Sequence, residues 1–493
     1  MKITFASRFA WLGCVCCLAI SASAKDHFLT IGGGYAPSGN QASLERNVLS
    51  YQQLLSEKQL ATLPHDIYFA DGADPASDLQ VIDPSSLPPA NRLMAEFFGS
   101  QRDLGLTYRD HQIAGVRGAT SPRNIQGWFD TVGATMQRGD RLVLYVTSHG
   151  SESESKSDPY NTSISLWNQE KLRVDQLVGM LDRLPQGVSV VAIMVQCHAG
   201  GFARYIYNDG NPDKGLSAQQ RCGFFATVHD RSAAGCTPEI DEASYVEYST
   251  YFWEAIAGRS QLNRTFTLPD YDRDGQVCFD EAHAYTILVS DTIDLPIKTS
   301  DEYLRQASCY RDDQRPHLLP RDLVYEQVLE LATPTDLAVL EGLSMQLELG
   351  GSARLEAAQK MMSQSRQRGR GRNRGRPDGT SSQLRRGIAG DVLARWPELA
   401  NLLNPVAVEL LTTRSADFIR AIEVHPDYPR YRGLVDNAQT GLSDQERLVK
   451  FERFIRAVEN VILRENLRRL DDPTLQTAYQ VIVAAESATL PAS

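Results

Sequence analysis

The sequence predicts an α/β protein with a mostly parallel sheet flanked by helices, followed by an all-α C-terminal domain. Apolar, strand-like runs alternate with helical patterns from about residue 27 to residue 290. Such alternation is typical of parallel strands with helices packed on both faces of the sheet. After about residue 320 only the three-to-four spacing of apolar residues that helices require remains. We therefore expect an α/β domain over residues 25–320 and a helical region over residues 321–493.

The expected elements follow from the apolar pattern, taken in chain order. Residues 73–122, which are polar and contain prolines, are expected to be a long insertion in the α/β part. Ser443, with Glu446 three residues later, forms a capping-box pattern that predicts the start of a long helix. The expected strands are 27–34, 65–72, 141–150, 188–197 and 222–230, and the expected helices before the boundary are 43–60, 124–140 and 173–184.

The segment 365–387 is rich in arginine and glycine. Its like charges and glycines predict a disordered linker between helices. Nucleic-acid binding and a protease-sensitive processing site are the alternatives for this segment. The formal net charge of -11 over the whole chain argues against nucleic acid as a partner.

The first 24 residues have the organisation of a secretory signal peptide. Lys2 and Arg8 precede an apolar stretch over 9–20, and the small residues 22–24 fit a cleavage site. An uncleaved anchor is the alternative. No later stretch is long and apolar enough to span a membrane. We therefore expect a soluble protein exported to a periplasm or to the extracellular space.

Removal of residues 1–24 would leave five of the eight cysteines. Exported proteins tend to oxidise their thiols, so an odd number leaves one thiol without an intramolecular partner. Closeness in sequence favours the disulfides Cys222–Cys236 and Cys278–Cys309, although spacing does not decide the connectivity. Cys197 is then the candidate for a free thiol.

Two of the expected strands end in residues that can do chemistry together. His149 and Gly150 follow the apolar run 141–147, and Cys197 follows the run 188–195. Because parallel strands end at the same edge of a sheet, the imidazole and the thiol should lie near each other. A histidine can deprotonate the thiol and protonate a leaving amine, while the thiolate attacks a carbonyl. The backbone N–H groups of Gly150 and Cys197 are candidate oxyanion donors, and His198 is a rival base that should point to the opposite side.

These strand ends resemble those of the caspase-like cysteine peptidases, which include caspases, metacaspases and legumain-type enzymes. The resemblance covers about residues 26–290 and is carried by Ser148-His149-Gly150 and by Gln196-Cys197-His198-Ala199-Gly200. Cys-His-Ala-Gly is similar to the Cys-His-Ser-Gly of metacaspases. The resemblance implies that His149 is the catalytic base and acid and that Cys197 is the nucleophile.

The same resemblance places the primary substrate pocket near Val195, two residues before the nucleophile. The families often have an acidic residue or glutamine at that position, so Val195 does not assure binding of arginine or lysine. A charge for the pocket would come instead from Asp230, Asp241 or Glu242. Asn40 is the candidate for the asparagine that supports the histidine in legumains.

Residues 270–281 match the pattern of an EF-hand-type calcium loop. Oxygen-bearing side chains occupy loop positions 1, 3, 5 and 12, with glycine at position 6. Pro269 makes the usual incoming helix doubtful. We expect the loop to bind calcium in a structural or regulatory role. Nothing in the sequence indicates an organic cofactor. The expected ligands are Asp270, Asp272, Asp274, Gln276 and Glu281.

Together these patterns predict an exported cysteine endopeptidase that cleaves peptide bonds through a thioester intermediate. Its substrate would be a protein or peptide, and its C-terminal helices would be a pro-domain or would bind a protein partner. The first alternative is an inactive, calcium-stabilised caspase-like scaffold that binds a partner. The second is a transpeptidase, because an amine can intercept the same thioester.

Overall fold

The structure is a computed structural model that describes residues 24–83, 86–102, 104–237, 247–260, 265–371, 379–438 and 443–491. The expected signal peptide, apart from Ala24, lies outside the described residues, as do Asp241 and Glu242. Within the described ranges, no helix combines the length and the apolar character needed to cross a membrane.

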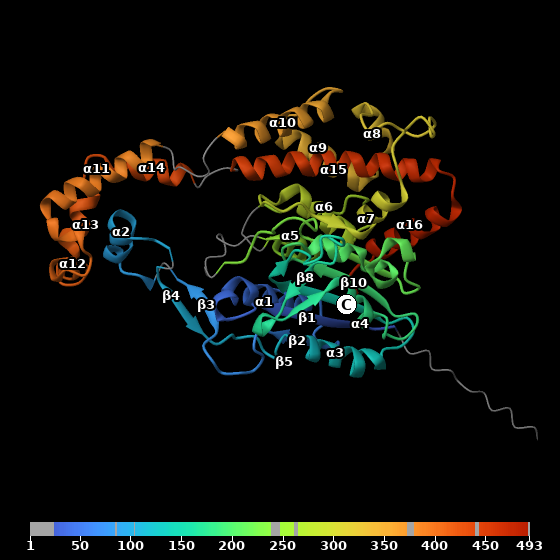
Figure 1. Cartoon of the computed structure of the whole chain (residues 1–493), viewed down its shortest axis with the longest axis horizontal. Coiled ribbons are helices and arrows are strands. Elements are labelled where there is room, and N and C mark those ends of the chain that lie inside the picture. Colours follow the sequence, from blue (N-terminus) through green and yellow to red (C-terminus); the bar gives the residue numbers. More distant parts are fainter. Residues whose placement is uncertain are drawn as a thin grey trace, which may run out of the picture.

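A seven-stranded sheet forms the centre of the molecule, in the order β12-β11-β10-β6-β1-β2-β5 (Figure 1). Neighbouring strands are parallel except for the antiparallel pair β11 and β12. The predicted α/β class and mostly parallel sheet are therefore confirmed. The short strands β5 and β12 were not predicted. The strands are β1 (Asp26–Gly33), β2 (His65–Phe69), β5 (Val116–Gly118), β6 (Arg141–Ser148), β10 (Ser189–Met194), β11 (Arg221–Phe225) and β12 (Ile297–Lys298).

Helices cover both faces of this sheet, which explains why its central strands are apolar throughout. On one face, alternate residues of β6 and β10 pack against α1, α5 and α6. On the other face, the intervening residues pack against α3, α4, α7 and α16. These helices are α1 (Ala42–Glu57), α3 (Pro122–Thr131), α4 (Val174–Leu181), α5 (Tyr248–Ala257), α6 (Phe279–Val289), α7 (Thr299–Ala307) and α16 (Pro473–Glu486).

Two small antiparallel sheets and a distant helix complete the α/β part. The strands β7, β8 and β9 form one small sheet directly after β6, and β3 and β4 form the other. The segment expected as an insertion carries β3, β4 and the helix α2 (Pro89–Phe98), and it also supplies β5 to the main sheet. The small strands are β3 (Leu79–Ile82), β4 (Leu106–Arg109), β7 (Gly150–Ser151), β8 (Ser163–Ser165) and β9 (Lys171–Arg173).

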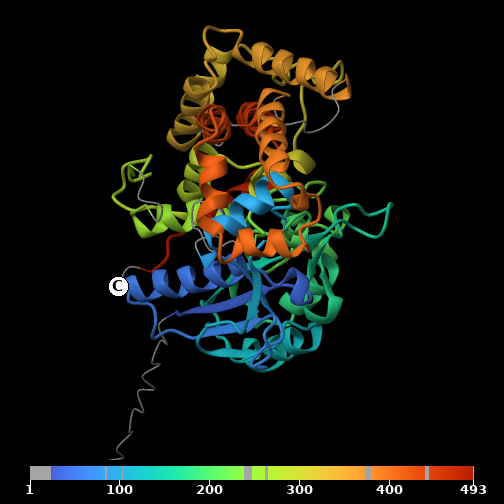
Figure 2. The ribbon, with the colours of Figure 1, turned by 90° about the vertical axis from the view of Figure 1, so that its left-hand side faces the viewer.

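The helices after residue 320 do not pack as one separate unit. Helices α8, α9, α10 and α15 share an apolar cluster with α6, and α16 packs on the sheet (Figures 1 and 2). Helices α11–α14 pack with α2 at one side of the molecule instead. The expected boundary near residue 320 is therefore not a break in the packing. These helices are α8 (Tyr325–Leu331), α9 (Pro334–Gln346), α10 (Arg354–Gly371), α11 (Gly379–Arg395), α12 (Pro405–Leu411), α13 (Ser415–Glu423), α14 (Tyr428–Ala438) and α15 (Asp444–Arg469).

Parts of the segment 365–387, which was expected to be a disordered linker, lie in helices. Helix α10 runs through to Gly371 and α11 begins at Gly379, while residues 372–378 lie outside the described part. Leu355, Ala358 and Met362 of α10 belong to the apolar cluster shared with α15, which fixes the start of α10. Arginine and glutamine are good helix formers, so the helix continues beyond its last packed turn. The predicted capping box at the start of α15 is confirmed, because the Ser443 hydroxyl accepts the Glu446 N–H at 3.2 Å.

Candidate active site

The ends of β6 and β10 bring the predicted histidine and cysteine to the same edge of the sheet. The two strands are parallel neighbours, with Met194 opposite Val146 as the last pair. His149 and Cys197 each follow three residues after that pair. An ideal Cβ on Gly150 would lie 1.9 Å from the carbonyl oxygen of Cys197, so the two chain segments touch. The structure therefore places the predicted dyad on adjoining segments of backbone.

The hydrogen bond of the His149 ring defines its tautomer. Nε2 lies 2.8 Å from the carbonyl oxygen of Gly39, which can only accept, so Nε2 carries the proton. Burial lowers the pKa of His149, against a smaller opposing effect of the Gly39 hydrogen bond. The ring also packs edge-on against Tyr35, with centroids 5.2 Å apart. His149 is therefore neutral near pH 7, and the lone pair of Nδ1 is available to take a proton.

Asn40 does not contact the histidine ring, so its expected role is corrected to an indirect one. Its fully buried side chain accepts the Gly34 N–H at 3.0 Å and donates to Asp78 at 3.0 Å. These bonds fix the turn over residues 34–40, which carries the Gly39 carbonyl. Asn40 thus holds the acceptor for His149 in place.

The Cys197 thiol is partly exposed and has a backbone donor beside it. Sγ accepts the N–H of Ala233 at 3.2 Å, from the loop that follows β11. A donor at this position stabilises a thiolate more than a thiol. Among the described residues, the N–H of Cys197 itself has no hydrogen-bond partner. It is therefore free to bind an oxyanion, and Gly150, the other expected donor, lies at the start of β7.

The ring of His198, the rival base, bonds to the loop after β11. Its Nδ1 lies 2.9 Å from the carbonyl oxygen of His229, and its backbone N–H donates to Arg231 at 2.8 Å. The residue has φ 60°, because the chain turns sharply after the strand. His198 therefore anchors the turn and the neighbouring loop.

The two residues proposed for a substrate pocket lie apart from each other. Val195 is 4% exposed and belongs to the apolar cluster under α5, because strand alternation continues through it. Its expected role in lining an open pocket is therefore corrected to a core position. Asp230 is exposed and lines a groove against α15 that includes Glu452.

The two expected disulfides are not formed. All five cysteines in the described chain are unpaired. Cys222 is completely buried in β11 under α5, whereas Cys236 packs against the different cluster around α1 and β2. Cys278 is the N-cap of α6, and the sulfur of Cys309 accepts a hydrogen bond from Arg315. Closeness in sequence was misleading because each pair is divided between different parts of the fold.

A buried carboxyl group near this edge was not predicted from the sequence. Glu247, 2% exposed, accepts hydrogen bonds from Asn47 and Ser249 and lies against Gly235. Asn47 also donates to Thr147 at 2.9 Å, two residues before His149. Burial is the largest cause that raises the pKa of Glu247, to about 8. The sequence around Glu247 has no pattern that marks it, because its partners are distant in the chain.

Replacing Glu247 by glutamine is expected to stabilise the protein in a pH-dependent way. The raised pKa keeps the folded carboxyl neutral, while the unfolded chain ionises near its ordinary value of 4.5. Wild type therefore loses stability as the pH rises from about 4.5 to about 8, and Glu247→Gln does not. We expect the variant to gain on the order of 3 kcal/mol at pH 8 relative to its difference at pH 5. Urea unfolding at both pH values measures this gain, and an equal difference at both would contradict it.

The predicted calcium loop gathers three of its five expected ligands. One oxygen each from Asp270, Asp272 and Asp274 lies within 4.8 Å of the others. Glu281 is turned to the backbone, where it accepts N–H groups of Tyr271, Asp272 and Cys278. Gln276 donates its own N–H to Asp274 at 2.8 Å. This acidic triad could hold a metal ion.

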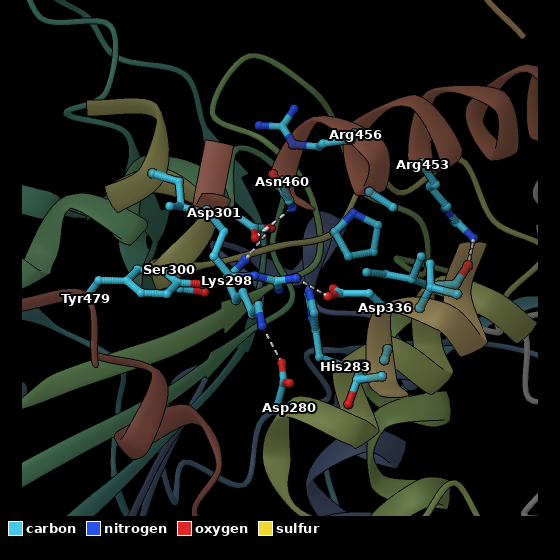
Figure 3. A pocket seen from close by; sticks show the side chains of 18 residues that line it. Asp280, His283, Lys298, Ser300, Asp301, Asp336, Arg453, Arg456, Asn460 and Tyr479 are labelled. Carbon is cyan, nitrogen blue, oxygen red and sulfur yellow. Dashed lines mark hydrogen bonds and ion pairs between the residues drawn. The ribbon is translucent and has the colours of Figure 1, made fainter. Parts of the chain in front are cut away.

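A separate polar cavity of about 70 Å³ lies between α6, α7, α15 and α16 (Figure 3). Neither His149 nor Cys197 lines it. Two ion pairs line it: Lys298 with Asp280, and Arg464 with Asp336. These pairs join β12 to α6 and α15 to α9, and we assign the cavity no chemistry.

Comparison with known proteins supplies no family. No family model matches the chain, and no curated protein matches it. Among solved structures, the crystal structure of protein GSU0716 from Geobacter sulfurreducens aligns over 56% of this chain and 93% of that chain, with 12% sequence identity and a TM-score of 0.31. A similarity of this size carries no argument about function.

Proposed function

We propose that the protein is an exported cysteine endopeptidase of the caspase-like kind, with Cys197 as the nucleophile and His149 as the base and acid. The observation that carries the proposal is the state of His149 at the edge it shares with Cys197. Its Nε2 is bonded to the Gly39 carbonyl, which leaves Nδ1 unprotonated, and the strand that leads to His149 is paired with the strand that leads to Cys197. The Ala233 N–H at the sulfur supports a thiolate.

The proposed reaction uses these groups in two stages. His149 Nδ1 takes the thiol proton, and the thiolate forms a bond to the carbonyl carbon of the scissile peptide. The oxyanion accepts the free N–H of Cys197, and His149 gives its proton to the leaving amine as the C–N bond breaks. Water then attacks the thioester, His149 takes a proton from it, and the acid leaves with release of the thiolate.

Incubation with a mixed peptide library, followed by mass spectrometry of the products, tests this proposal. Pairs of fragments, one with a new carboxyl end and the other with a new amino end, are expected from wild type and absent with Cys197→Ala. Products joined to an added amine would support transpeptidation instead. Intact peptides with every substrate offered would favour the inactive scaffold. Its exposed apolar residues Leu403, Val408 and Val424, in and beside α12 and α13, would then serve a partner.

The acid limb of the pH profile of kcat/KM is expected below 6.5, the ordinary pKa of histidine. Burial holds the pKa of His149 below 6.5, so the ring stays neutral and able to accept a proton at lower pH. We expect kcat/KM to fall only as the pH drops through this lowered value. An acid limb above pH 6.5 would contradict the assignment of His149 as the base.

We also propose that the loop 270–281 binds calcium, supported by the carboxylate triad and the sequence pattern. Calcium at about a hundred times its Kd is expected to add about 2.7 kcal/mol to the free energy of unfolding. The double variant Asp270→Asn/Asp272→Asn should lose this gain, and the exposed Asp209→Asn should keep it. Thermal unfolding with calcium and with chelator measures the effect, and equal melting temperatures for wild type would exclude the site.

A further inference from the structure

Two consecutive residues of α15 reach the segments that surround Cys197. The first contact is made by Arg453, which is 2% exposed. Among the described residues, its guanidinium donates to the last turn of α6 and to the turn that follows it, and Figure 3 shows the side chain extending from α15. The acceptors are the carbonyl oxygens of Ile287 at 3.0 Å, Ser290 at 2.7 Å, Thr292 at 3.1 Å and Asp294 at 2.9 Å.

The turn after α6 is hydrogen-bonded to the loop beside the Cys197 thiol. The Asp294 carboxylate accepts the N–H of Ala234 at 2.7 Å, and the Thr292 hydroxyl donates to the same carboxylate at 2.9 Å. The preceding residue, Ala233, donates its N–H to Cys197 Sγ. Arg453 is therefore linked to the sulfur through one side chain and two consecutive backbone amides.

The second contact is made by Glu452, on the other side of Ala233. Its Oε1 accepts from Arg231 Nη2 at 2.9 Å. The Arg231 carbonyl accepts the N–H of His198, the residue after Cys197, at 2.8 Å. Glu452 and Arg453 thus hold both ends of the segment 231–234.

We propose that Glu452 and Arg453 are positioning residues for the Cys197 thiol, so that α15 is a required part of the active site. This inference rests on the proposed peptidase function. The Ala233 N–H supports a thiolate only while it points at the sulfur, and a donor displaced by an ångström loses most of its effect. A C-terminal region that acts as a removable pro-domain would have to leave α15 in place.

The test measures the rate of iodoacetamide alkylation of Cys197 from pH 5 to pH 9 in the full-length protein. Arg453→Met and Glu452→Gln are expected to shift the rate profile to higher pH, with about a tenfold lower rate at pH 7 for Arg453→Met. Arg464→Met is the matched control, because it removes a partly buried ion pair of the same helix with Asp336 on α9. Its profile should equal that of wild type. Thermal unfolding identifies any variant that fails to fold. If Arg453→Met does not fold, the alkylation profile of Glu452→Gln, which removes a partly exposed contact, tests the proposal.

Hydrogen exchange over residues 230–236 gives a second readout that needs no reactive thiol. Faster exchange in both α15 variants, but not in Arg464→Met, supports the positioning role even if wild-type Cys197 proves inert and the peptidase function fails. Unchanged alkylation and unchanged exchange in the folded variants would overturn the inference and leave the peptidase function standing.

Discussion

Replacing Cys197 by alanine is expected to abolish peptide hydrolysis, with kcat/KM at least about a thousandfold below wild type. The thiolate supplies the bond that forms in the first stage, and no other side chain of the described site replaces it. His198 is bonded to the loop at His229, and Cys236 is partly buried against the apolar cluster around α1 and β2. The fold should be unaffected, because the Cys197 side chain is partly exposed at a strand end.

Cys309→Ala is the control for this result, since Cys309 is also a partly exposed thiol, and its contact is with Arg315. Its activity should equal that of wild type. Hydrolysis that persists in Cys197→Ala would show that another group is the nucleophile.

Replacing Gly150 by alanine is expected to lower kcat/KM on the order of a hundredfold. The added Cβ would lie 1.9 Å from the carbonyl oxygen of Cys197 and 2.8 Å from the side chain of Gln196. Backbone at this distance has to move, and the movement separates the segments that carry His149 and Cys197. Strain from such overpacking costs about 1–3 kcal/mol of stability, which leaves a folded protein to assay.

Gly127→Ala provides the matched control, because no atom lies within 4 Å of its added Cβ in α3. Alanine there is expected to leave activity unchanged and to stabilise the helix slightly. If Gly150→Ala retains full activity, the close approach of the two strand ends is not needed for function.

The sheet was predictable because its signal is local. The apolar runs that became β1, β2, β6, β10 and β11 are continuous in sequence, and their ends located His149 and Cys197. The short strands β5 and β12 have two or three residues each and carry no such signal. The helical arrangement could not be predicted because α2 contacts α11 and α14 across 289 and 335 positions of the chain.

The support of the site was not predictable for the same reason. Arg453 reaches Asp294 across 159 positions, and Asn47 reaches Glu247 across 200. These contacts depend on how helices are placed after folding, and an arginine or glutamate on a helix gives no sign of them. The sequence indicates Asn40 as a residue that supports His149. That it acts through the Gly39 carbonyl follows only from the geometry of the turn.

Labelling of Cys197 in wild type and in His149→Ala tests the central claim most directly. Folded, full-length protein is treated with iodoacetamide at pH 7, and the labelled residues are located by mass spectrometry. The proposed dyad predicts rapid labelling at Cys197 that falls by on the order of tenfold or more without His149. Equal labelling of both proteins, or an inert Cys197 in folded wild type, would contradict the dyad.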